Sequence, residues 1–202
     1  MRRIQIDPVH PDPRLIKMAV DVLRSGGVIA YPTDTVYGIG CDFTQKKAVD
    51  WVYQLKRMKA DQPLAFLCPD LGDLAKYAVV DDSTYRLMRR LTPGPYCFIL
   101  RATREAPRIL HIHKKRKQVG IRVPHDEIAL ALVRELGNPI VSTSASWEGE
   151  TLNDPNDIAA HYGGVDMFLD AGWGMLEPST VLDLTGDGVD IVRQGAGPID
   201  MI

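Results

Sequence analysis

Hydrophobic positions recur at helical spacing in several parts of the chain. In residues 14–27, RLIKMAVDVLRSGG, the apolar side chains that share one helical face are Leu15, Ile16, Ala19, Val20 and Leu23. Asp12 and Pro13 are typical of a helix start, and Gly26 and Gly27 are typical of a helix end. Similar patterns predict further helices at residues 46–59, 70–77, 83–91, 126–137 and 157–161.

Short apolar runs between these helices have the length and composition of buried strands. They cover residues 28–33, 64–68, 96–102, 119–124, 139–146, 165–172, 179–185 and 189–195. Because strands and helices alternate through most of the length, the pattern predicts an α/β fold with helices layered on a sheet. The last strands follow one another without a helix between them, which predicts a mixed rather than a fully parallel sheet. We find no repeat or linker, and we expect a single domain over residues 1–202.

The bulk composition is that of a globular protein, with 45% hydrophobic and 25% charged residues. The chain has 24 basic and 26 acidic residues and a formal net charge of −2, so any affinity for nucleic acid must come from a local patch. The three cysteines are widely spaced and form no Cys-x-x-Cys pair, which argues against a disulfide framework and a zinc site. No apolar stretch has the character of a signal peptide or a membrane-spanning helix, so we expect a cytoplasmic protein with no membrane partner.

A polar segment, TDTVYGIG at residues 33–40, directly follows the first predicted strand. Its hydroxyls and its carboxylate belong to Thr33, Asp34, Thr35 and Tyr37. Gly38 and Gly40 allow a close approach of the backbone. Because ligands of open α/β sheets bind beyond the strand ends, this segment is a candidate binding loop. The alternative is an ordinary turn held by a side-chain hydrogen bond.

Three further segments carry candidate anion-binding side chains. The predicted helix at 46–59 ends in three cations, Lys56, Arg57 and Lys59. Cations there either complement the helix dipole, by about 0.3–1 kcal/mol each, or bind phosphate. The run STSAS at residues 142–146 follows a buried strand, and it is either a phosphate- or carboxylate-binding nest or an ordinary serine-rich loop. Near the C-terminus, residues 178–197 predict a hairpin that brings Ser179 close to Arg193.

Residues 86–122 carry eleven basic side chains against a single acid, Glu105. This asymmetry favours a surface that tracks RNA phosphates, and the expected RNA contacts are Lys114, Lys115, Arg116 and Lys117. A solvated basic loop is the alternative, and the scarcity of aromatic residues disfavours a base-stacking platform. His111 and His113 have no carboxylate or cysteine close in sequence, so we expect no metal site there.

Seven motifs in collinear order resemble the YrdC-type domain family over about residues 10–198. They are YPTDTVYGIGCD, LKRMK followed by PLAF, TPGPYCFIL, VGIRVP, IVSTSAS, PSTVLDL and VRQGAG. Several short motifs in one order are more specific than any one of them. The resemblance implies a YrdC-like fold, a twisted mixed β-sheet with flanking helices around a positively charged cavity.

The family's characterised enzymes join L-threonine, bicarbonate and ATP into threonylcarbamoyl-adenylate and pyrophosphate, and the adenylate serves the modification of an adenosine in tRNA. The resemblance therefore implies ATP as a substrate, Mg²⁺ bound with its triphosphate, and no permanent cofactor. The implied threonine contacts are Thr33, Thr35, Arg122 and Ser179. The implied ATP contacts are Lys56, Lys59, Ser142, Ser144 and Arg193. The implied catalytic residues are Lys56 and Arg57.

Three positions depart from the pattern of these enzymes and are closer to the YciO branch of the family. Met58 stands where the enzymes have the arginine of Lys-x-Arg, Cys97 where threonine is common, and Ser146 where they have asparagine. The resemblance thus implies a YciO-like protein that binds nucleotide and RNA, with the nucleotidyl-transfer activity of a threonylcarbamoyl-adenylate synthase. The alternative is a non-catalytic protein that binds tRNA or double-stranded RNA. Carbamoyl transfer to another acceptor ranks below both, because no zinc-finger or acylphosphatase-like segment accompanies the motifs.

Overall fold

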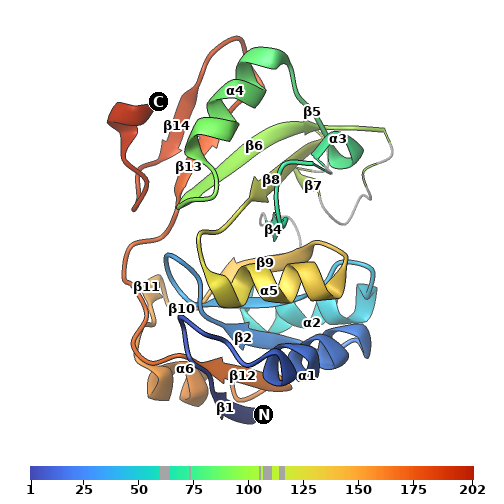
Figure 1. Cartoon of the computed structure of the whole chain (residues 1–202), viewed down its shortest axis with the longest axis vertical. Coiled ribbons are helices and arrows are strands. Elements are labelled where there is room, and N and C mark those ends of the chain that lie inside the picture. The colour runs from blue at the N-terminus through green and yellow to red at the C-terminus, as the bar shows by residue number, and fades with distance from the viewer. Residues whose placement is uncertain (60–63, 73, 105, 107–110, 114–116) are drawn as a thin grey trace.

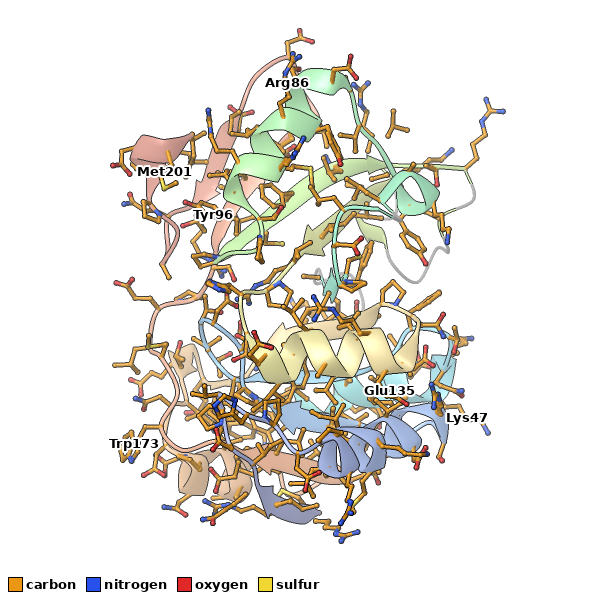
Figure 2. All side chains as sticks on the ribbon, viewed as in Figure 1. Lys47, Arg86, Tyr96, Glu135, Trp173 and Met201 are labelled. Carbon is orange, nitrogen blue, oxygen red and sulfur yellow. The ribbon has the colours of Figure 1, made fainter. Side chains whose placement is uncertain are left out.

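The computed structural model describes residues 1–59, 64–72, 74–104, 106, 111–113 and 117–202, with the backbone alone for 111–113. Within this part of the chain, one sheet of twelve strands runs through the long dimension of the molecule (Figure 1). Helices flank the sheet, and charged side chains such as those of Lys47, Arg86 and Glu135 lie on the outside (Figure 2).

The main path of the sheet places sequence-distant strands side by side. The order is β1 (Arg2–Gln5), β12 (Met167–Asp170), β2 (Ile29–Tyr31), β3 (Gly38–Asp42), β9 (Ile140–Ser144), β4 (Ala65–Leu67), β8 (Gln118–Arg122), β6 (Tyr96–Ala102), β13 (Thr180–Asp183) and β14 (Asp190–Arg193). Off this path, β5 (Ala78–Val79) pairs with β6 and β7 (His111–His113) with β8, and β10 (Ser146–Trp147) forms a separate hairpin with β11 (Glu150–Thr151). The sheet contains parallel pairs such as β4 with β8 and antiparallel pairs such as β4 with β9, so the prediction of a mixed sheet is confirmed.

Aspartates start four of the helices. The helices in the described residues are α1 (Pro13–Arg24), α2 (Lys46–Leu55), α3 (Leu74–Tyr77), α4 (Asp82–Leu91), α5 (Glu127–Leu136) and α6 (Pro155–His161), followed by a 3₁₀ turn at Ile199–Met201. The side chains of Asp12, Asp81, Asp126 and Asp154 accept backbone N–H groups in the first turns of α1, α4, α5 and α6. Gly137 ends α5 in the left-handed conformation, with φ of 76°.

Apolar side chains cover both faces of the sheet. Along β2, Ala30 packs into a large cluster with Phe66 and Phe168. Its neighbours Ile29 and Tyr31 point to the other face, into a second cluster formed with α1 and α5. Strands that are buried on both faces are apolar throughout, which explains why they are recognisable as continuous runs. None of the helices in the described part of the chain has the length and apolar character that crossing a membrane requires.

The predicted helices and strands mostly occur where the pattern placed them. β6 coincides with the predicted strand 96–102, and α4 and α5 lie within one residue of their predicted bounds. α2 is shorter than predicted and ends at Leu55, because Arg57 adopts a left-handed backbone with φ of 50°. α3 starts later than predicted, because the Asp70 carboxylate accepts the N–H of Gly72 in a turn.

The second half of the polar segment 33–40 belongs to a strand, because Gly38 and Gly40 lie in β3. Its glycines are required by neighbouring parts of the protein. A Cβ on Gly40 would lie 2.7 Å from the carbonyl oxygen of Val141, and one on Gly38 would lie 3.0 Å from the ring of Tyr31. The apolar pattern also does not predict β1, a strand whose residues are mostly exposed.

Candidate functional site

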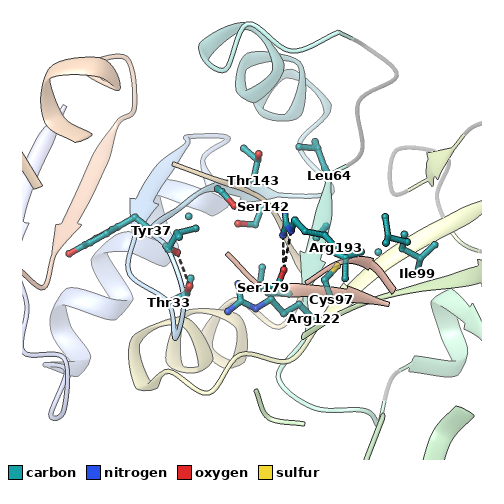
Figure 3. A pocket seen from close by; sticks show the side chains of 18 residues that line it. Thr33, Tyr37, Leu64, Cys97, Ile99, Arg122, Ser142, Thr143, Ser179 and Arg193 are labelled. Carbon is teal, nitrogen blue, oxygen red and sulfur yellow. Dashed lines mark hydrogen bonds between the residues drawn. The ribbon is translucent and has the colours of Figure 1, made fainter. Parts of the chain in front are cut away.

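A cavity of about 530 Å³ lies between β3, β4, β8 and β9 on one side and β6, β13 and β14 on the other (Figure 3). Hydroxyl groups reach it from the turns and strand ends. Aliphatic side chains such as Leu64, Ile99 and Val192 form another part of its wall. Among the described lining residues, the charged ones are two arginines, Arg122 and Arg193. Such a lining suits an organic anion that also has an apolar part.

Six of the residues that the sequence predicted to bind threonine or ATP line this cavity together. They are Thr33, Arg122, Ser142, Ser144, Ser179 and Arg193. They come from five separate motifs of the chain, and the sheet order brings them together. Their ligands stay a prediction.

Other predicted residues lie elsewhere. Four of the predicted residues are not among the described residues that line the cavity: Thr35, Lys56, Arg57 and Lys59. Thr35 is buried, and its hydroxyl lies 3.2 Å from that of Thr33. The predicted RNA contacts are only partly described: Lys117 is exposed, whereas residues 114–116 lie outside the described residues.

Arg122 forms a buried ion pair with Asp34 beside the cavity. The two side chains are 10% and 9% exposed, and Nη2 of Arg122 donates to Oδ1 of Asp34. Two buried polar atoms of this pair, Oδ2 of Asp34 and Nε of Arg122, have no hydrogen-bond partner within the described structure. Buried groups of this kind are costly to leave unpaired, so this corner of the cavity wall carries an electrostatic cost in the structure.

Asp126 adds a second carboxyl group to this corner. It accepts the N–H of Ala129 at 2.8 Å and so caps α5. Burial raises the pKa of Asp126 to about 6; the nearby Asp34 charge adds to the rise, and Arg122 opposes it. The charge around Arg122 therefore changes near pH 6.

The hydroxyl of Ser142 is oriented by a buried tyrosine. Tyr31 donates its O–H to Oγ of Ser142 at 2.7 Å. Burial raises the pKa of Tyr31 above its ordinary value, which keeps this hydroxyl protonated. Because Oγ accepts that proton, the hydrogen of Ser142 is left to donate to another group, such as an anion in the cavity.

Thr33 fits both interpretations of the segment 33–40, a side-chain turn and a binding loop. Its hydroxyl donates to the carbonyl of Val36 at 2.7 Å and accepts the N–H of Thr35 at 3.1 Å, which is the side-chain turn that was the alternative to a binding loop. Thr33 nevertheless lines the cavity (Figure 3).

Arg193 is fixed by the predicted C-terminal hairpin. Its Nε and Nη2 donate to the backbone carbonyl of Ser179 at 3.2 and 2.8 Å (Figure 3). The turn after β14 is anchored to the start of β13, because the N–H of Gly195 donates to the hydroxyl of Thr180 at 3.0 Å and that hydroxyl donates to the carbonyl of Gly197 at 2.7 Å. The hairpin thus brings the guanidinium to Ser179 as expected, although to its carbonyl.

Cys97 also lines the cavity, between the two arginines. Burial raises the pKa of its thiol to about 11, although Arg122 and Arg193 lower it. The thiol is therefore protonated at neutral pH and serves as a small apolar wall element rather than a nucleophile.

Lys56 lies beside the cavity but points to other protein groups. Its Nζ donates to the carbonyl of Ser146 at 2.6 Å, to the hydroxyl of Ser146 at 2.9 Å and to the hydroxyl of Tyr162 at 2.9 Å. Burial lowers the pKa of Lys56 to about 8. The guanidinium of Arg57 lies over the ring of Trp147, 4.4 Å from its centroid, and the Arg57 side chain is exposed.

No pattern in the sequence predicts the residues that orient the predicted site residues. Asp34 lies 88 positions from Arg122, Tyr31 lies 111 positions from Ser142, and Tyr162 lies 106 positions from Lys56. Because no local pattern links residues so far apart, only the sheet order reveals these pairs.

The sequence and the fold of the chain resemble those of known proteins. A family model described as "Telomere recombination", for Sua5, YciO and YrdC, matches residues 21–195. The uncharacterized protein YciO of Escherichia coli K12 is 41% identical over 197 residues, covering 96% of this chain and 95% of that protein. The crystal structure of E. coli YciO has a TM-score of 0.94 at 40% identity, covering 100% of this chain and 99% of the other.

More distant relatives are named for a reaction. The threonylcarbamoyl-AMP synthase of Pyrococcus abyssi is 31% identical over 195 residues, covering 93% of this chain but 56% of that protein. The crystal structure of P. abyssi Sua5 complexed with L-threonine has a TM-score of 0.91 at 28% identity, covering 99% of this chain and 59% of the other. The threonylcarbamoyl-AMP synthase of Serratia proteamaculans is 32% identical over 184 residues, covering 87% of this chain and 94% of that protein.

Proposed function

The chain belongs to the Sua5/YciO/YrdC family, and from that membership we propose that it is a YciO-like nucleotide-binding protein with threonylcarbamoyl-AMP synthase activity. The reaction joins L-threonine, bicarbonate and ATP into threonylcarbamoyl-AMP and pyrophosphate. The observation that carries the proposal is the convergence of Arg122, Arg193 and four hydroxyl side chains on one cavity. Relatives named for the reaction, at 31% and 32% identity, and the Sua5 structure with L-threonine support it.

In this proposal the amino acid lies at the Arg122 end of the cavity. Arg122 lines the cavity, and a carboxylate is the acceptor that a guanidinium binds best. The hydroxyls of Thr33 and Ser179 line the same cavity and would contact the remaining polar groups of threonine.

The triphosphate lies toward Ser142, Ser144 and Arg193. A carbamate oxygen of N-carboxythreonine attacks the α-phosphorus, the bond from that phosphorus to the bridging oxygen breaks, and pyrophosphate leaves. The protein supplies orientation and positive charge rather than a strong base. Mg²⁺ would be held by phosphate oxygens and water, because the described residues contain no group of three or more His, Cys, Asp or Glu side chains placed to hold a metal.

A direct assay tests this function. Purified protein with L-threonine, bicarbonate and Mg-ATP should release pyrophosphate and form threonylcarbamoyl-AMP, detected by mass spectrometry. Arg193→Ala should lower kcat/KM by about 10- to 100-fold, because it removes a charge-assisted contact to the nucleotide. Arg134→Ala, an exposed arginine on α5, is the matched control and should retain activity. Absence of product with the wild type, or equal rates for Arg193→Ala and the control, contradicts the proposal.

Exposed cations favour a second candidate, a non-catalytic role in binding tRNA or double-stranded RNA. Five exposed arginines lie on α4 and at the end of β6: Arg86, Arg89, Arg90, Arg101 and Arg104. Within the described residues the structure gives none of them an ion pair with a carboxylate. Lys117, the described member of the predicted RNA contacts, is exposed as well. Phosphate backbones bind to such surfaces without base contacts.

Salt dependence tests this second role. The affinity for a tRNA or an RNA duplex should fall steeply with added salt, because each phosphate contact releases a counterion. Replacing Lys114, Lys115, Arg116 and Lys117 by alanine should weaken binding and lower the salt slope by roughly one unit for each phosphate that the variant no longer neutralises. Lys46→Ala/Lys47→Ala is the control, because Figure 2 shows Arg86 at the top of the molecule and Lys47 at the side of its lower half. An unchanged slope in the quadruple variant would remove this segment from the RNA surface.

A further inference from the structure

Ser146 and Tyr162 engage every donor of the Lys56 ammonium group. An ammonium has three protons, and the three acceptors are the carbonyl and hydroxyl of Ser146 and the hydroxyl of Tyr162. Tyr162 in turn donates its proton to the Ser146 carbonyl, so the three side chains form a closed network. Burial raises the pKa of Tyr162 to about 12, so its hydroxyl remains a donor.

The Lys56 network, consisting of Lys56, Ser146 and Tyr162, is connected through the chain to residues that line the cavity. Ser146 comes two residues after Ser144, which lines the cavity, and two residues of extended chain span only about 7 Å. Met58 comes two residues after Lys56, and its Sδ accepts the hydroxyl of Thr143, another lining residue, at 3.9 Å. A lysine side chain placed there can therefore turn toward a phosphate in the cavity.

We propose that Ser146 and Tyr162 are positioning residues that hold Lys56 away from the cavity, so that a polyphosphate entering it must compete with them for the ammonium group. This inference rests on the proposed function, because it names what controls the predicted catalytic lysine. It is specific to a chain that has serine at position 146 and a tyrosine hydroxyl at position 162.

A bound phosphate is a better partner for the Lys56 ammonium group than its present acceptors, but moving the ammonium group breaks existing hydrogen bonds. All three present acceptors are neutral, and a charge-assisted bond to a phosphate oxygen is stronger than a bond to a neutral oxygen. However, turning Lys56 away deprives the hydroxyl of Tyr162 and the carbonyl of Ser146 of a donor. Breaking the network therefore opposes phosphate binding, and a variant that lacks one member of the network should bind phosphate more tightly.

Tyr162→Phe isolates this effect. The ring of Tyr162 is fully buried, and phenylalanine keeps it while removing one acceptor of Lys56. Calorimetry with sodium tripolyphosphate should show binding about three- to tenfold tighter than for the wild type, the factor that corresponds to one net hydrogen bond. Acetylation of Lys56 by acetic anhydride, followed by mass spectrometry, should become at least about threefold faster in the same variant. Ser146→Ala, which removes only the hydroxyl acceptor, should show the same changes to a smaller degree.

Two controls make the result specific to Lys56. Tyr96→Phe removes another buried tyrosine hydroxyl, one that donates to the carbonyl of Pro198 at 2.8 Å, and should leave both measurements unchanged. In a Lys56→Ala background, Tyr162→Phe should no longer alter tripolyphosphate affinity.

Weaker or unchanged tripolyphosphate binding by Tyr162→Phe overturns the inference, as does unchanged labelling of Lys56 or a lack of tripolyphosphate binding by every variant. These readouts need no turnover. A protein that binds tripolyphosphate in the expected order but forms no threonylcarbamoyl-AMP would contradict the proposed function and leave the role of Ser146 and Tyr162 intact.

Discussion

Replacing Arg122 by alanine should lower the free energy of unfolding at pH 8 by about 3–5 kcal/mol, the range for removing one partner of a buried ion pair. The reason is the position of Asp34, whose side chain is 9% exposed and would be left in the core without the cation that pairs with it. Its Oδ2 already lacks a partner within the described structure, so no alternative donor is at hand. Urea unfolding without ligand measures the effect.

A double-mutant cycle supplies the control for this prediction. Asp34→Asn/Arg122→Ala removes both charges and should be more stable than Arg122→Ala alone, because no unpaired carboxylate remains in the core. A loss of less than about 1 kcal/mol in the single variant would mean that water reaches Asp34 and that the ion pair behaves as a surface pair.

The loss of unfolding free energy in Arg122→Ala, called here its deficit, should depend on pH. Asp126 has a pKa raised from 3.8 to about 6, so the folded chain binds its proton more tightly than the unfolded chain does. The stabilisation from this protonation is present below pH 3.8 and is lost as the pH rises through about 6. Arg122 lowers the pKa of Asp126, so removing Arg122 raises that pKa further. The loss of stability that accompanies deprotonation of Asp126 then becomes larger and extends to higher pH. We therefore expect a smaller deficit at pH 5 than at pH 8.

Gly195→Ala should be the second most damaging substitution for the cavity. A Cβ at this position would lie 2.0 Å from the carbonyl oxygen of Pro178 and 2.8 Å from the carbonyl carbon of Ser179. Both are backbone atoms and cannot rotate aside, so the turn after β14 must move away from the start of β13. We expect a loss of about 2–3 kcal/mol in stability. Because the same shift breaks the bonds between Arg193 and the Ser179 carbonyl, ATP affinity should fall by at least about tenfold.

The same hairpin contains matched glycines for comparison. A Cβ on Gly186 or Gly188 would meet no heavy atom of the described residues within 4 Å. Gly186→Ala and Gly188→Ala should therefore stay within about 0.5 kcal/mol of the wild type and retain ATP affinity. Thermal unfolding and ATP titration of the three variants decide the prediction. Equal behaviour of Gly195→Ala and Gly188→Ala would show that the cavity wall tolerates the displaced turn.

The sequence predicts most helices and strands because their apolar period or their apolar runs are visible locally. β6 and α5 are examples, since each is bounded by recognisable residues such as Pro95 and Gly137. β1 and β3 escape prediction because β1 is mostly exposed and β3 is rich in glycine. Packing against Tyr31 and Val141 explains those glycines, and the local pattern does not reveal it.

The candidate site is likewise predictable only in part. The resemblance of the motifs identifies six residues that line the cavity, including Arg122 and Arg193. It does not reveal that Asp34 pairs with Arg122, or that Lys56 is bound to Ser146 and Tyr162. These are contacts between side chains 88 to 106 positions apart, and their geometry depends on the order of the strands.

The position of β4 between two other strands has a consequence for the size of the ligand. β4 lies between β9 and β8, with Ala65 opposite Ser142 and Leu67 opposite Arg122. Neighbouring strands are about 4.8 Å apart, so the backbones that carry Ser142 and Arg122 are separated by roughly 10 Å. A phosphate or an amino acid alone is shorter than this separation, whereas an amino acid joined to a phosphate has a comparable length. Under the proposed function, the spacing across β4 therefore favours the joined compound over either of its parts.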